Sequence, residues 1–106
     1  MGGWQSEDLI EQIKEFLKSI GAEEAILFGS RARGDELETS DVDLIVIDDK
    51  FAGMPFPRRL IYLSQRWNLS YFLEAFPYTH EEFEKLSKTR GVVADAAKHG
   101  IRIKVA

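Results

Sequence analysis

The stretch that most limits how this chain can fold is a short apolar run that contains one acidic residue. It spans residues 42–47, Val-Asp-Leu-Ile-Val-Ile, and is rich in the β-branched side chains that favour strands. A second run, Ala-Ile-Leu-Phe at residues 25–28, ends at Gly29 and Ser30 and is too short for a typical helix. We therefore predict two buried strands, one of which carries a charged side chain, Asp43, within it.

The segments around these runs have the spacing of amphipathic helices. From Leu9 to Ile20 apolar residues recur every three or four positions, with Ser6 as the expected N-cap and Gly21 as the stop signal. The remaining pattern predicts helices over about 57–67, from 80 onward and over about 92–98, a strand over 69–76 and a candidate edge strand over 101–105. This order predicts an α+β fold with a small mixed central sheet of about three strands and helices packed mainly on one face.

Composition narrows the classes of function. With 106 residues, 44% of them hydrophobic, the chain is expected to form a single domain over residues 1–106. Its net charge of -4 argues against general binding of nucleic acid, which relies on clustered Lys and Arg. There is no cysteine and no apolar stretch long enough for a membrane span or a signal peptide. We expect a cytoplasmic protein that does not associate with membranes.

Two aspartates at the start of the second run suggest metal chemistry. Side chains alternate along a strand, so Asp41 and Asp43 should project from the same face, roughly 6 to 7 Å apart. Two carboxylates so placed can share Mg²⁺, which prefers oxygen ligands. An Asp-x-Asp pair alone is a weak signal, and aspartates often begin strands as solvated charges. That simpler reading explains Asp43 poorly, because a charge inside an apolar run is costly to bury without a partner.

Gly29 and Ser30 supply a complementary half of a site. A glycine lets the backbone approach a phosphate closely, and a helical turn after it would offer free N–H donors beside the Ser30 hydroxyl. Together these groups could hold the β and γ phosphates of a nucleoside triphosphate. Two metal ions beside them would serve an in-line displacement at the α phosphorus.

These residues also carry a family resemblance. The segments 27–34, Leu-Phe-Gly-Ser-Arg-Ala-Arg-Gly, and 39–46, Thr-Ser-Asp-Val-Asp-Leu-Ile-Val, resemble the signature of the DNA polymerase β nucleotidyltransferase superfamily, and specifically its minimal nucleotidyltransferases. The resemblance implies a palm-like fold, two Mg²⁺ ions, ATP or another nucleoside triphosphate as donor, and a third carboxylate on a later strand. By position that carboxylate is Glu74, where many relatives have Asp. Arg31 and Arg33 are candidates for contacts to the triphosphate, or they cover the loop.

The resemblance implies an activity and leaves the acceptor open. It implies transfer of a nucleoside monophosphate, AMP if ATP is the donor, with release of pyrophosphate. Minimal members of the family are often paired with a small all-helical HEPN-type protein, in some systems as antitoxin and toxin, and the acceptor or partner here is expected to be such a protein or a second copy of the chain. The alternative is a non-enzymatic, antitoxin-like module that neutralises a helical partner by covering it.

The other charged residues are expected to have ordinary structural or solvent-exposed positions. Arg58, Arg59 and Arg66 lie in one predicted helix and could form a basic patch, but a solvated helix face is the more ordinary outcome. His80 falls in the first turn of a predicted helix and His99 near the end of another. We expect capping or solvent exposure for both histidines, because neither has ligand spacing to another.

Overall fold

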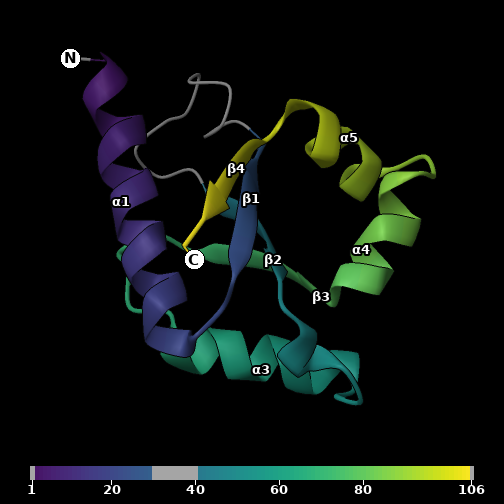
Figure 1. Cartoon of the computed structure of the whole chain (residues 1–106). Coiled ribbons are helices and arrows are strands. Elements are labelled where there is room, and N and C mark those ends of the chain that lie inside the picture. Colours follow the sequence, from purple (N-terminus) through teal and green to yellow (C-terminus); the bar gives the residue numbers. More distant parts are fainter. Residues whose placement is uncertain (1, 30–40, 106) are drawn as a thin grey trace.

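The computed structural model describes residues 2–29 and 41–105, which form a mixture of helices and strands (Figure 1). The elements in chain order are α1 (Gly2–Ile20), β1 (Glu24–Phe28), β2 (Val42–Ile47), the 3-10 helix η1 (Asp49–Phe51), α3 (Phe56–Arg66), β3 (Leu73–Tyr78), α4 (His80–Ser87), α5 (Val92–His99) and β4 (Ile101–Lys104). The predicted α+β class is confirmed. The first helix begins at Gly2, earlier than the expected cap at Ser6, and it ends before Gly21, whose φ of +68° suits the stop predicted there.

The strands form one mixed sheet with the order β3-β2-β1-β4. β1 runs antiparallel to β2 and to β4, whereas β2 and β3 run parallel. The sheet has four strands rather than the predicted three or so. The fourth is the candidate edge strand of the sequence analysis, and it pairs with β1 from Glu24 opposite Lys104 to Leu27 opposite Ile101.

The longer helices, α1 and α3, cover one face of the sheet (Figure 1). Alternate residues of β1 and β2, such as Leu27 and Leu44, point toward this face, as the period of a strand requires. The core on this side includes Leu9, Ile13, Phe16, Leu17, Ile20, Ala25, Leu27, Val42, Leu44, Val46, Phe51, Leu63 and Ile103, all buried.

The shorter helices, α4 and α5, cover part of the opposite face. Their buried residues Phe83, Val93 and Ala96 pack against Ile26, Ile45 and Ile47 of the sheet. The expectation of helices mainly on one face therefore holds for α1 and α3 and needs correction for α4 and α5. The physical reason is that β1 and β2 are apolar on both faces, and a strand of this kind requires cover on both sides.

In the part of the chain that the structure describes, no helix combines the length and the apolar character that crossing a bilayer requires.

Candidate active site

The three carboxylates predicted from the sequence come from one end of the sheet. Asp43 lies in β2, with Asp41 immediately before that strand, and Glu74 lies in β3. Asp43 and Glu74 are direct register partners in the parallel pair, so their side chains project from the same face of the sheet. Helices α4 and α5 cover this same face nearer to the other end of the strands. Asp41 and Glu74 are exposed and Asp43 is half-buried. This end of the sheet is where β1 ends and β2 and β3 begin.

The negative charges of Glu74 and Asp41 affect the pKa of Asp43. The pKa of the Asp43 carboxyl is raised above its ordinary value, first by burial and then by the negative charge of Glu74. A side-chain hydrogen bond to Glu74 and the charge of Asp41 raise it further. Carboxylates that repel in this way are stabilised by a cation between them, and their hard oxygen atoms match the preference of Mg²⁺. The donor set therefore fits the divalent metal that the sequence predicts.

Two physical reasons favour glycine at position 29. The φ of Gly29 is +78°, a backbone conformation that residues other than glycine adopt only at a cost. A Cβ atom at this position would also lie 2.3 Å from Oδ2 of Asp43, far inside van der Waals contact. Gly29 therefore makes room for the carboxylate that lies in the middle of the predicted site. Ser30 and Arg33, predicted to hold the triphosphate with Gly29, lie outside the described residues.

A groove runs beside Glu74 along the outer side of β3. It has a volume of about 380 Å³ and is lined from α3 by Leu60, Ile61 and Ser64 and from β3 by Leu73, Glu74 and Ala75. The exposed fractions of Leu60 and Ile61 are 37% and 55%, unusually large for apolar side chains of this size. A substrate in this groove would lie next to the carboxylate of β3.

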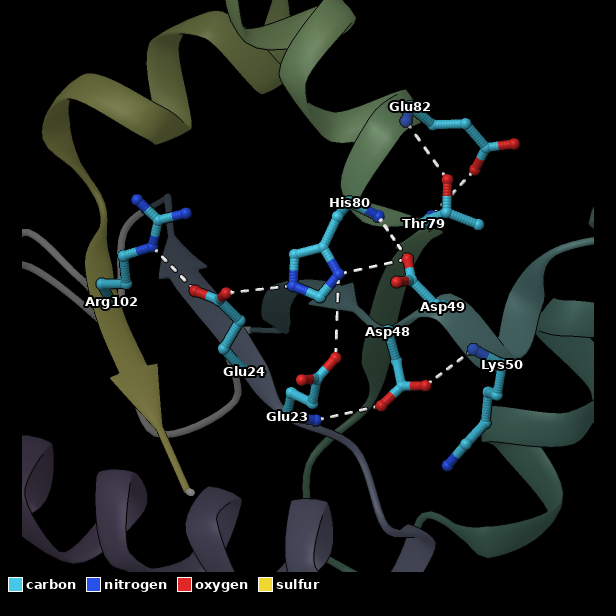
Figure 2. A network of polar contacts seen from close by, with 9 residues as sticks. All are labelled: Glu23, Glu24, Asp48, Asp49, Lys50, Thr79, His80, Glu82 and Arg102. Atoms are coloured by element: carbon cyan, nitrogen blue, oxygen red, sulfur yellow. Dashed lines mark hydrogen bonds and ion pairs between the residues drawn. The ribbon is translucent and has the colours of Figure 1, made fainter.

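A second polar network lies at the opposite end of the sheet, where β1 begins and β2 and β3 end (Figure 2). Nδ1 of His80 lies 3.1 Å from Oδ1 of Asp49 and 3.7 Å from Oε1 of Glu23, and its Nε2 lies 3.3 Å from Oε2 of Glu24. The Nε of Arg102 donates to the other oxygen of Glu24 at 3.0 Å. Here the carboxylates face Arg102 and a histidine that carries positive charge when protonated, whereas the side chains that act on Asp43 at the other end are carboxylates.

This network was not predicted from the sequence. His80 was expected to be a capping or solvent-exposed residue, yet Glu23, Asp49 and His80 bring three potential metal-ligating atoms within 4.8 Å of one another. Within the described residues, no group of this compactness includes Asp41, Asp43 and Glu74. The three residues of the network are far apart in the sequence and share only their position beside the ends of strands. That shared position was the one feature of the sequence from which the network could have been predicted.

Comparison with known proteins identifies the class to which this fold and site belong. Residues 10–103 match the family described as the nucleotidyltransferase domain, and the chain therefore belongs to that family. Its members transfer nucleoside monophosphates, so the protein is a transferase of this class.

The chain is also similar to one relative in sequence and to one solved structure in fold. A protein of Methanocaldococcus jannaschii named "Putative protein adenylyltransferase" is 34% identical, and the alignment covers 76% of this chain and 87% of the relative. A crystal structure described as "a putative nucleotidyltransferase from Sulfolobus solfataricus" superposes with a TM-score of 0.60 at 24% identity, over 80% of each chain. The second similarity concerns the fold alone.

Proposed function

We propose that this protein transfers AMP from ATP to a hydroxyl group of a protein acceptor and depends on Mg²⁺ to do so. The observation that carries the proposal is the register of β2 and β3, which sets Asp43 beside Glu74 next to the space that Gly29 leaves open. Membership of the nucleotidyltransferase family supports the reaction class. The name of the relative from M. jannaschii supports ATP as the donor and a protein as the acceptor.

The site residues fall into two groups in this proposal. Asp41, Asp43 and Glu74 would hold two Mg²⁺ ions through their carboxylate oxygens. When bound, such ions polarise the α phosphate and neutralise the charge of the departing pyrophosphate. Gly29, with Ser30 and Arg33, holds the triphosphate chain of ATP.

The reaction balances without a protein nucleophile. The acceptor oxygen forms a bond to the α phosphorus of ATP, and the bond from that phosphorus to the oxygen bridging to the β phosphate breaks. Pyrophosphate leaves with the electron pair of that bond. Glu74, exposed and next to the groove, accepts the proton of the acceptor hydroxyl. A carboxylate in this position acts as a general base if the hydroxyl comes within hydrogen-bonding distance.

The test is transfer of label from ATP labelled at the α phosphate, in the presence of Mg²⁺, to proteins that co-purify with this one. Asp43→Asn keeps the size of the side chain and removes its charge, so it should lower transfer by about 10²-fold or more. Asp95→Asn is the matched control, because Asp95 is an exposed residue of α5, and it should leave transfer unchanged. Equal transfer by wild type and Asp43→Asn would refute the assignment.

The same assay separates the enzyme from a purely binding module. A small helical partner of the HEPN type, or a second copy of the chain, is the partner that we propose to test first. Label on the partner, lost in Asp43→Asn, would support the enzyme. A partner that is bound and neutralised equally by wild type and Asp43→Asn, without any label, would support the binding module.

A further inference from the structure

The outer edge of β3 offers main-chain hydrogen-bonding groups. β3 is the first strand of the sheet order, so β2 is its one neighbour among the described strands. An open edge of this kind is able to pair with an extended segment of another chain.

Two hydrogen bonds show which residues of β3 face outward. The amide of Val42 donates to the carbonyl of Phe72, and the amide of Asp48 donates to the carbonyl of Tyr78. Main-chain groups alternate in direction along a strand. The even-numbered residues of β3 therefore bond to β2, and Leu73, Ala75 and Pro77 direct their main-chain groups outward.

Pro77 and Arg59 confirm this alternation and limit the open part of the edge. Pro77 lacks an N–H group, and an outward position is one where proline removes no bond from the sheet. Its carbonyl accepts a hydrogen bond from Nη1 of Arg59 at 3.2 Å. Within the described residues no hydrogen bond is made from the outer side to the main chain of Leu73 or Ala75. The open part of the edge is thus the part that contains Glu74.

The two faces of this edge differ in chemistry. The side chains of Leu73 and Ala75 pack toward α3, where the groove exposes Leu60 and Ile61. Glu74 lies on the other face with Asp43. A strand added to this edge would therefore place alternate side chains against an apolar groove and against the carboxylates.

We propose that the acceptor is an extended polypeptide segment that adds to the outer edge of β3. This inference rests on the proposed function and specifies its acceptor. The hydroxyl residue, Ser, Thr or Tyr, lies directly opposite Glu74, since directly opposed residues share a face and their Cβ atoms are only about 5 Å apart. The residues immediately before and after it are apolar and contact Leu60 and Ile61. The hydroxyl oxygen bonds to the α phosphorus, its proton goes to Glu74, and pyrophosphate leaves.

A peptide library tests the extended conformation directly. Ten-residue peptides with a fixed central Ser, Thr or Tyr and random flanks are incubated with the protein, Mg²⁺ and ATP labelled at the α phosphate, and the labelled peptides are sequenced. We expect apolar residues to be enriched at the positions directly before and after the hydroxyl residue. Enrichment three or four positions away, the spacing of a helix, would overturn the inference, as would label on whole proteins but on no peptide. Either result would leave the proposed function standing, whereas absence of label on every protein and peptide would refute both.

Substitutions at the edge test the same inference on the protein. Ala75→Pro removes the outward N–H and keeps the bonds to β2, as Pro77 already does, so it should lower kcat/KM for a library-selected peptide about tenfold or more while Mg²⁺-dependent ATP binding persists. Ile61→Asp should have a similar effect, and Val92→Asp, at an equally exposed apolar site of α5, should have none. Unchanged kcat/KM in Ala75→Pro or in Ile61→Asp would overturn the proposal. Loss of a dimer in Ala75→Pro with unchanged labelling would assign this edge to a second copy of the chain.

Discussion

Replacement of Gly29 with alanine is the sharpest single test of how β1 and β2 build the site. The added Cβ atom would lie 2.3 Å from Oδ2 of Asp43, where ordinary van der Waals contact begins near 3.4 Å. The carboxylate must therefore move by about 1 Å or rotate away. A displacement of this size at a reacting centre lowers the rate by about 10²-fold.

The same substitution also strains the backbone, and this part of its effect has a matched control. The φ of Gly29 is +78° and that of Gly53 is +77°, but a Cβ atom at Gly53 meets no atom within 4 Å. A left-handed conformation costs an alanine about 1–2 kcal/mol, which lowers the melting temperature of a domain of this size by about 4–8 °C per kcal/mol. Gly53→Ala should show this loss of stability alone.

The assay compares both variants with wild type by thermal unfolding and by transfer of label from ATP. We expect both to melt below wild type, Gly29→Ala at least as far below as Gly53→Ala. Only Gly29→Ala should lose transfer, at a temperature where all three proteins are folded. If Gly29→Ala and Gly53→Ala transfer AMP equally well, the position of Asp43 next to Gly29 does not matter for the reaction and the reasoning fails.

Two further predictions concern stability. The pKa of His80 is raised from 6.5, mainly by its hydrogen bond to Asp49. The contribution of protonated His80 to stability is therefore complete below about pH 6.5 and is lost as the pH rises through the raised pKa. The melting temperature should fall between about pH 6 and 8 in wild type and fall less in His80→Ala, and parallel plots of melting temperature against pH for the two proteins would contradict this. Arg59 is 6% exposed and donates to the carbonyl of Pro77 and to both carboxylate oxygens of Glu82, so Arg59→Met should lower the free energy of unfolding in urea by about 2 kcal/mol, and a change below about 0.5 kcal/mol would contradict the assigned pairing.

The sequence predicted those parts of the fold that depend on local pattern. The periodicity from Leu9 to Ile20 and the apolar runs at 25–28 and 42–47 identified one helix and two strands, because burial of one helix stripe or of a whole strand leaves a short-range signature. The alternation of side chains predicted that Asp41 and Asp43 share a face. The resemblance to the family added Glu74, which the structure sets in register with Asp43.

Contacts between distant segments could not be predicted in this way. Arg59 looked like part of a solvated helix face, but it is buried because Glu82 and the carbonyl of Pro77 receive its hydrogen bonds. His80 looked like a capping residue, and only the folded sheet brings Glu23 and Asp49 to it. The helices on the second face of the sheet could have been predicted from the sequence, since apolar residues at both odd and even positions of a strand require helices on both sides.

The two ends of the sheet differ in how their charges are balanced, and this difference agrees with the proposed function. At one end His80 and Arg102 supply ion-pair partners to Glu23, Glu24 and Asp49, so the folded chain itself provides partners for these carboxylates. At the other end burial and the neighbouring carboxylates destabilise the charged form of Asp43.

The Asp43→Asn variant removes that destabilised charge, so in the presence of a chelator it should melt at or above the melting temperature of wild type even though it has lost its transfer activity. A residue that lowers the stability of the metal-free fold is expected where the charge serves a ligand and the fold does not require it. If Asp43→Asn melted well below wild type in the chelator, the carboxylate would instead be a structural part of the sheet.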